Sequence, residues 1–117
     1  MNEQNNSKDH GVNVKDAQSA IEAGAVLLDV READEFVAGH AQGAISIPLS
    51  ELNERYVELN KDSEIYAICK SGGRSGQASG SLQDAGYNVT NVIGGSLDWH
   101  GSGLPFVSEN GEEPTVI

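Results

Sequence analysis

The sequence has 117 residues, with 7 Lys or Arg against 18 Asp or Glu, so its formal net charge at pH 7 is −11. This length suits one domain, and so acidic a surface repels phosphate backbones and anionic lipid headgroups. We therefore expect neither nucleic acid nor a membrane as a partner, and no stretch reaches the roughly 20 apolar residues of a membrane span. The single cysteine cannot form a disulfide within the chain, which is typical of a reducing compartment. We expect a cytoplasmic location.

Both ends of the sequence are polar and charged. We expect residues 1–10 to form a disordered leader without the apolar segment of a signal peptide. Residues 108–117, "SENGEEPTVI", are expected to form a flexible acidic tail. The folded domain is therefore expected at residues 11–107.

Within this domain, short apolar runs alternate with helical patterns. In chain order, the expected elements are a helix at 13–24 that Asn13 caps, a strand at 25–30, a helix at 31–39, a strand at 44–48, a helix at 50–60, a strand at 64–68, a helix at 74–86, a strand at 88–93 and a helical turn at 95–103. This alternation predicts an α/β fold, with a mostly parallel central sheet flanked by helices on both faces. In such sheets, ligands bind beyond the carboxyl ends of the strands.

The only cysteine, Cys69, follows the third predicted strand and opens the stretch "CKSGGRS" (69–75). Gly72 and Gly73 lack Cβ atoms, so the backbone can turn with positive φ and its N–H groups can converge on one point. The helix that follows adds unpaired N–H groups and the positive end of its dipole. The loop between strand and helix is therefore a candidate cradle for an anion.

A thiolate in such a cradle is stabilised by N–H dipoles and by nearby cations. Lys70 and Arg74 are close together in sequence, and both flank the loop. We expect them, with the helix that begins near Arg74 or Ser75, to lower the pKa of Cys69. Ser71 and Ser75 could donate hydrogen bonds to a bound sulfur, or Ser75 could serve only as a helix cap. The competing interpretation is that Cys69 is an inert, buried residue at a strand end.

Three ordered stretches resemble the signatures of the single-domain rhodaneses, a family of sulfurtransferases. Residues 27–52, "LLDVREADEFVAGHAQGAISIPLSEL", resemble the N-terminal signature of the family, and residues 91–106, "NVIGGSLDWHGSGLPF", resemble its C-terminal signature. The cysteine loop lies between them. The resemblance covers nearly the whole expected domain, from about residue 12 to residue 106. It implies a rhodanese-like fold with the cysteine loop as the active site.

The resemblance also implies a reaction. Cys69 would take a sulfane sulfur from a donor such as thiosulfate and hold it as a persulfide, which the N–H groups of residues 70–74 would stabilise. Lys70 and Arg74 would attract the anionic donor. The acceptor would be cyanide or a thiol, including a thiol of a protein partner. We expect a monomer without metal or cofactor, since the three histidines lack metal-ligand spacing.

Two other functions stay open. One is a phosphatase or an arsenate-reductase-like enzyme: rhodaneses resemble a class of phosphatases in which five residues separate cysteine and arginine, whereas four separate Cys69 from Arg74 here. The shorter loop forms a smaller ring of N–H groups, which suits one sulfur better than a tetrahedral phosphate. The other alternative is a non-catalytic rhodanese-like module that binds partners. Such modules commonly lack the cysteine that this sequence keeps.

Two charged residues near the end of the first predicted strand are candidate supports of the site. Asp29 could orient the loop or Arg74, but we favour a structural ion pair between Asp29 and Arg31. Glu32 and Glu35 are then expected to be charges on a helix surface, and either could pair with Arg31.

Two further side chains have a functional and a structural interpretation. His40 could be a general base, but in "GHAQGA" we favour a turn histidine bonded to the backbone. Trp99 could line the mouth of the pocket, but an apolar side chain in a helical turn more often fills a core.

Overall fold

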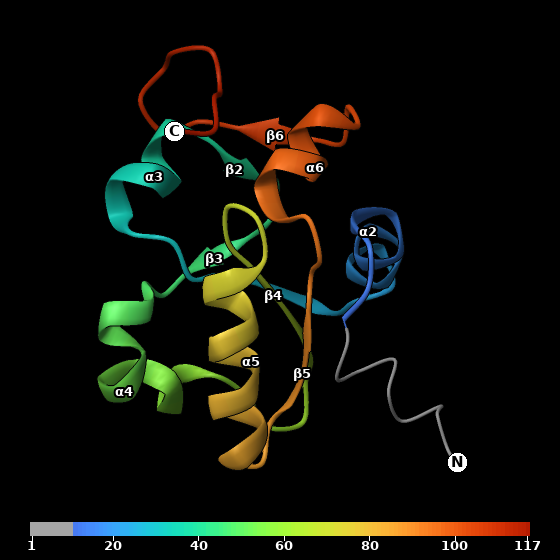
Figure 1. Ribbon diagram of the computed structural model, residues 1–117, viewed down its shortest axis with the longest axis vertical. Helices are drawn as coiled ribbons and strands as arrows, with labels where there is room; N and C mark the ends of the chain where they lie inside the picture. The colour runs from blue at the N-terminus through green and yellow to red at the C-terminus, as the bar shows by residue number, and fades with distance from the viewer. Residues whose placement is uncertain (1–10) are drawn as a thin grey trace.

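The computed structural model describes residues 11–117 (Figure 1), so the predicted leader lies outside the described residues. The elements in chain order are α2 (Val14–Glu22), β1 (Val26–Asp29), α3 (Ala33–Ala38), β2 (His40–Ala41), β3 (Ile45–Ser46), η2 (Leu49–Glu51), α4 (Leu52–Arg55), η3 (Tyr56–Glu58), β4 (Glu64–Ile68), α5 (Gly73–Asp84), β5 (Asn88–Asn91), α6 (Gly95–Gly101) and β6 (Phe106–Val107). None of the described helices is long and apolar enough to cross a membrane.

The central sheet has four strands in the order β3-β1-β4-β5, and every neighbouring pair is parallel. The prediction of a parallel α/β fold is therefore confirmed. A second, antiparallel pair joins β2 to β6. Each of these two strands has two residues, too few for an alternating apolar pattern, and the sequence did not predict them.

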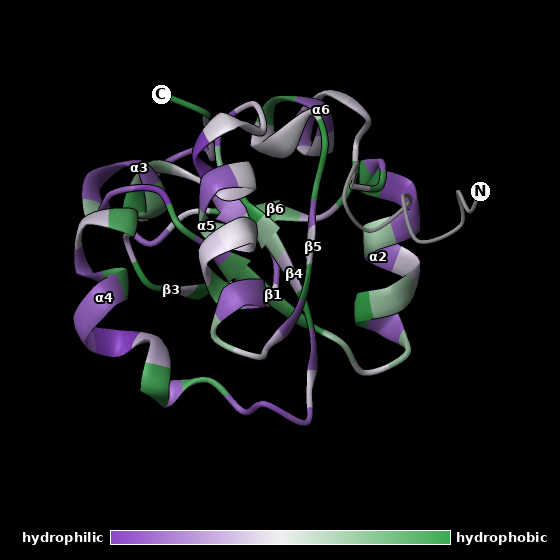
Figure 2. Ribbon diagram, turned by 60° about the horizontal axis from the view of Figure 1, so that its bottom comes forward, coloured by the Kyte–Doolittle hydropathy of each residue, from purple (hydrophilic) through white to green (hydrophobic). Residues whose placement is uncertain are grey.

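Alternate residues of the central strands face opposite sides of the sheet, and both sides are covered by helices (Figure 1). On one side, Leu28 and Ile65 pack with residues of α4 and α5. On the other side, Leu27 and Tyr66 pack with residues of α2 and α6. Figure 2 shows β1 and β4 coloured mainly as hydrophobic, while β5 and the helices carry mixed colours. Because both faces are covered, the carboxyl edge of the sheet is left for the loops that carry chemistry.

The helix boundaries predicted from the sequence agree with the structure best where a single residue, such as an N-cap, determines them. The side chain of Asn13 accepts the N–H of Asp16 at 2.8 Å, which confirms it as the N-cap of α2. The helix predicted at 50–60 is instead three short segments, η2, α4 and η3. The helix predicted at 31–39 begins at Ala33, because Arg31 is drawn into the core by an ion pair described below.

The C-terminal segment, residues 108–117, lies against α3. The N–H of Glu109 donates to the carbonyl of Val37 at 2.9 Å, and the N–H of Thr115 donates to the carbonyl of Ala38 at 3.0 Å. These contacts satisfy carbonyl groups in the last turn of α3, which have no partner within the helix. That this segment is flexible in solution stays a prediction, and the exchange rate of the Thr115 amide would measure it.

Candidate active site

Cys69 lies at the carboxyl end of β4, one of the two inner strands of the sheet, and is 2% exposed. The loop that follows turns at Gly72, whose φ of +119° lies in the left-handed region that glycine adopts without strain. The helix α5 begins directly afterwards, at Gly73. The strand, the turn and the helix start therefore bring their N–H groups to the cysteine side chain.

The sulfur of Cys69 is an acceptor of several hydrogen bonds. The N–H of Gly72 donates to Sγ at 3.1 Å, and the hydroxyl of Ser75 lies 3.3 Å from it. Burial raises the pKa of the Cys69 thiol, but hydrogen bonds from the Ser75 hydroxyl and from the N–H groups of Ser75, Gly72 and Ser71 outweigh it, so the pKa is lowered. Ser71 contributes through its backbone, and its side chain is exposed.

Asn91, the last residue of β5, links the loop to the neighbouring strand. Its Nδ2 donates to the carbonyl of Gly72 at 3.1 Å, and its Oδ1 accepts the Ser75 hydroxyl at 2.6 Å. The first bond fixes which way the amide faces, so Oδ1 accepts the single hydrogen of the Ser75 hydroxyl and shares it with Sγ of Cys69. The sequence analysis did not single out Asn91. A polar residue at the carboxyl end of a strand adjacent to β4 is the signal that could have identified it.

Arg74 is paired with a carboxylate. Its Nη1 and Nη2 donate to the two oxygens of Glu35 at 2.7 and 2.9 Å. The bond to Arg74 is the main cause that lowers the pKa of Glu35, and the bond to Glu35 is the main cause that raises the pKa of Arg74. Glu35 could have paired with Arg31, but it pairs with Arg74, and Arg31 pairs with Asp29. The charge on Cys69 is itself among the causes that raise the pKa of Arg74, so the two groups interact, while hydrogen bonds are the larger causes that lower the pKa of Cys69.

Asp29 and Arg31 form the ion pair that the sequence analysis favoured. Arg31 Nη2 lies 2.8 Å from an oxygen of Asp29, and both side chains are fully buried. The same nitrogen donates to the carbonyl of Gly39 at 2.7 Å. This pair ties the end of β1 to the end of α3 and makes no hydrogen bond to the cysteine loop. Its geometry is that of a structural support.

The segment that follows β5 is hydrogen-bonded to the backbone of the cysteine loop. The N–H of Ser96 donates to the carbonyl of Cys69 at 2.8 Å, and the N–H of Leu97 donates to the carbonyl of Lys70 at 3.1 Å. A Cβ atom on Gly95 would lie 2.5 Å from that Lys70 oxygen. Two consecutive residues of the loop are thus fixed by the first turn of α6, and only glycine permits the approach.

The remaining two candidates have structural roles. His40 lies 2.8 Å through Nδ1 from the carbonyl of Phe36 and stacks on the Phe36 ring at 3.7 Å between centroids. Trp99 is 2% exposed and donates through Nε1 to the carbonyl of Pro105 at 2.8 Å. The expected bond of His40 to the backbone is confirmed, but His40 lies in strand β2 and not in a turn, and its Nε2 lies 3.3 Å from Glu109 Oε2. The interpretation of Trp99 as a core residue is confirmed.

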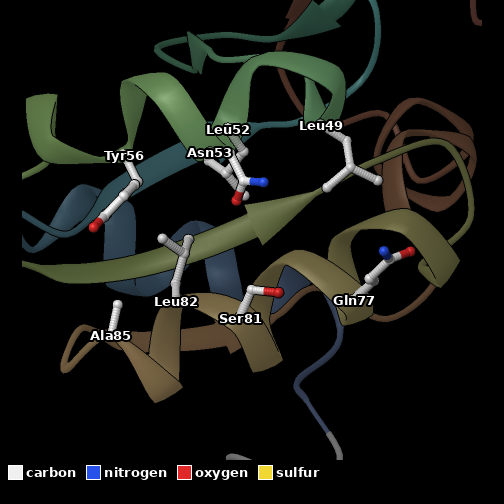
Figure 3. A pocket seen from close by; sticks show the side chains of 8 residues that line it. All are labelled: Leu49, Leu52, Asn53, Tyr56, Gln77, Ser81, Leu82 and Ala85. Carbon is white, nitrogen blue, oxygen red and sulfur yellow. The ribbon is translucent and has the colours of Figure 1, made fainter.

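A cavity of about 390 Å³ lies between α4 and α5 (Figure 3). Its walls carry the uncharged side chains of Leu49, Leu52, Asn53, Tyr56, Gln77, Ser81, Leu82 and Ala85. Cys69 and the loop residues do not line it, so this cavity is separate from the site around the sulfur.

The chain is similar to known proteins over most of its described length. Residues 13–102 match the Rhodanese-like domain family. The putative sulfur carrier protein YrkF of Bacillus subtilis is 45% identical over 76 residues, which are 64% of this chain and 41% of that protein. Thiosulfate sulfurtransferase 18 of Arabidopsis thaliana is 36% identical over 120 residues, which cover 90% of this chain and 88% of that protein.

Solved structures show the same likeness. A rhodanese-related protein from Thermoplasma volcanium, 37% identical, has a TM-score of 0.79 and covers 83% of this chain and 96% of its own. Three curated relatives that are 42% to 45% identical are longer proteins, of which this chain spans 38% to 62%. Since the family match extends over 13–102 and the fold agrees with that of a rhodanese-related structure, this chain belongs to the Rhodanese-like domain family.

Proposed function

We propose that this protein is a sulfurtransferase that moves a sulfane sulfur from a small donor to a thiophilic acceptor, with Cys69 as the nucleophile. The observation that supports it most is the set of hydrogen bonds on Sγ, which favour the thiolate even though the residue is buried. The thiolate is the form of cysteine that attacks sulfur. Relatives named sulfurtransferase, at 36% to 37% identity, support the reaction class.

In the first step, the Cys69 thiolate attacks the outer sulfur of the donor. With thiosulfate, a new sulfur–sulfur bond forms, the donor's own sulfur–sulfur bond breaks, and sulfite leaves with the electron pair. The product is a persulfide anion on Cys69. The N–H groups of Ser71, Gly72 and Ser75, together with the Ser75 hydroxyl, are placed to stabilise it as they stabilise the thiolate.

In the second step, the acceptor attacks the outer sulfur of the persulfide and the Cys69 thiolate leaves. Cyanide would become thiocyanate, and a thiolate would become an organic persulfide. The thiol of a protein partner is an acceptor of the same chemistry. The enzyme returns to its starting state, so the scheme needs no cofactor.

The test is incubation with thiosulfate, followed by measurement of the intact mass. We expect a gain of one sulfur atom on the native chain and none on Cys69→Ser, and we expect thiocyanate once cyanide is added. A chain that gains no sulfur and forms no thiocyanate would contradict the proposal.

The second candidate is a non-catalytic module that binds partners. One observation favours it: Cys69 is 2% exposed, and an inert cysteine is ordinarily buried. In that case the pH dependence of Cys69 alkylation would follow an ordinary thiol pKa of about 8.5. Phosphatase activity receives less support, because Arg74, the residue that would clamp a phosphate, is engaged by Glu35.

A further inference from the structure

The loop beside Cys69 carries less positive charge than its sequence suggests. Arg74 donates from both terminal nitrogens to Glu35, at 2.7 and 2.9 Å. Glu35 is itself held in place, because its Oε1 accepts the N–H of Glu32 at 2.9 Å in the capping box of α3. Its side chain is 14% exposed. A bidentate pair on a partly buried, backbone-bound carboxylate is far better fixed than an ordinary surface ion pair.

The other charges near the loop leave one cation without a partner. Arg31 is compensated by Asp29, and both side chains are fully buried. Lys70 makes no ion pair with any residue of the described range 11–117. A donor that approaches Cys69 thus meets one uncompensated cation, on a protein whose formal net charge is −11.

We propose that Glu35 is a specificity-determining residue, which neutralises Arg74 and so favours sulfur donors of low negative charge, of the class of organic persulfides, over dianionic ones. This inference rests on the proposed sulfurtransferase function. A dianion such as thiosulfate loses twice the attraction that a monoanion loses when a nearby cation is neutralised. It also experiences twice the repulsion from the acidic remainder of the surface.

An organic persulfide is a suitable donor for the same chemistry. The Cys69 thiolate attacks the outer sulfur of RS–SH, a sulfur–sulfur bond forms to Cys69, and the bond to the inner sulfur breaks. The thiolate RS⁻ leaves with the electron pair, and the proton stays on the new persulfide. No oxidant or reductant is needed.

The experiment compares two donors that differ by one charge. Methanethiosulfonate anion has the shape of thiosulfate with a methyl group in place of one charged oxygen, and it leaves as methanesulfinate. We measure kcat/KM for each donor with cyanide as the acceptor. The two leaving groups differ in reactivity, so the two kcat/KM values are not compared directly. The informative quantity is how the ratio of kcat/KM for thiosulfate to kcat/KM for methanethiosulfonate differs between the native chain and a variant.

Glu35→Gln should raise the ratio of thiosulfate to methanethiosulfonate by roughly threefold, since removal of one charge at about 6 Å in water-like surroundings changes the attraction of each donor charge by that factor. The amide keeps an oxygen that can accept from Arg74 and from the N–H of Glu32. This rise in the ratio should become smaller as the ionic strength increases above about 0.15 M, because salt screens the charges. An unchanged ratio would overturn the proposal.

The matched control is Glu58→Gln. Glu58 accepts from Arg55 at 3.0 Å on the α4 side of the molecule, and neither residue contacts the cysteine loop. This variant makes the same change in net charge, so a ratio that rises equally in both variants would also overturn the proposal. If neither donor loads sulfur onto any variant, the proposed sulfurtransferase function itself is wrong. That result is distinct from sulfur loading with an unchanged ratio.

Discussion

Two neighbouring strands of this sheet end in nearly the same way, and their loops serve different purposes. After β4, Gly72 with φ of +119° precedes α5; after β5, Gly94 with φ of +87° precedes α6. In each case a parallel strand leads through a left-handed glycine into a helix at the carboxyl edge of the sheet. The two loops differ in what their N–H groups bind.

In the first loop the N–H groups surround a side chain. The N–H of Gly72 donates to the sulfur of Cys69, and the N–H groups of Ser71 and Ser75 also lower the pKa of Cys69. In the second loop, the N–H groups of Ser96 and Leu97 donate to carbonyls of the first loop. The N–H groups at the start of a helix can therefore bind either an anion or the carbonyls of another loop. Here the loop after β5 binds the loop after β4 and so fixes its conformation.

The largest expected effect comes from breaking the second loop at Gly95. Gly95→Ala places a Cβ 2.5 Å from the Lys70 carbonyl at a residue whose φ is +58°, so both the contact and the backbone are strained. We expect a loss of about 2 kcal/mol or more in the free energy of unfolding, together with slower sulfur transfer. Denaturant unfolding and the thiocyanate assay measure the two effects.

The control for this variant is Gly80→Ala. Gly80 lies in α5 with nothing within 4 Å of an added Cβ and with an ordinary helical φ. Alanine should stabilise the helix there by about 0.5–1 kcal/mol. If both variants changed stability in the same direction, the support that we assign to Gly95 would be disproved.

The next effect comes from Asn91, which connects the two loops. Asn91→Ala removes the donor to the Gly72 carbonyl and the acceptor of the Ser75 hydroxyl. We expect a loss of about 1–2 kcal/mol in the free energy of unfolding and slower loading of sulfur from thiosulfate. Asn53→Ala, at an exposed position of α4, should leave both quantities nearly unchanged. Equal losses in the two variants would disprove the connecting role.

Ser75→Ala tests the side-chain donor to the sulfur. The Ser75 hydroxyl, whose hydrogen is shared between Asn91 Oδ1 and Sγ of Cys69, lowers the pKa of Cys69, so its removal raises that pKa. A smaller fraction of thiolate is then present at neutral pH, and we expect alkylation by iodoacetamide to slow roughly tenfold at pH 7. The pH profile of alkylation should shift to higher pH, and a profile that does not move would mean that the N–H groups alone set the pKa.

Much of this site could be predicted from the sequence because its signals are local. Strand, Gly72 and helix follow one another in "CKSGGRS", so the direction of their N–H groups follows from a few consecutive residues. The parallel sheet follows from the alternation of elements, and Asp29 and Arg31 are two residues apart. In each case the interacting groups are near in sequence or repeat with a regular spacing.

The parts that could not be predicted depend on contacts between distant segments. Arg74 and Glu35 are 39 residues apart, and Ser75 and Asn91 are 16 apart. Glu35 follows Arg31 at helical spacing, so a local pairing was the natural expectation, but Arg31 is turned into the core by Asp29. Only the assembled edge of the sheet shows that α3 supplies the carboxylate opposite Arg74.

The smallest effect is expected at Ser71, and it distinguishes backbone from side-chain donors. Ser71 lowers the pKa of Cys69 through its N–H group, and its hydroxyl is on an exposed side chain. Ser71→Ala keeps that N–H group, so the pH profile of alkylation should stay that of the native chain, in contrast to Ser75→Ala. A profile that shifted equally in both variants would show that the Ser71 hydroxyl turns inward to the sulfur. An unshifted profile would mean that, at this position, the loop requires only a backbone N–H group.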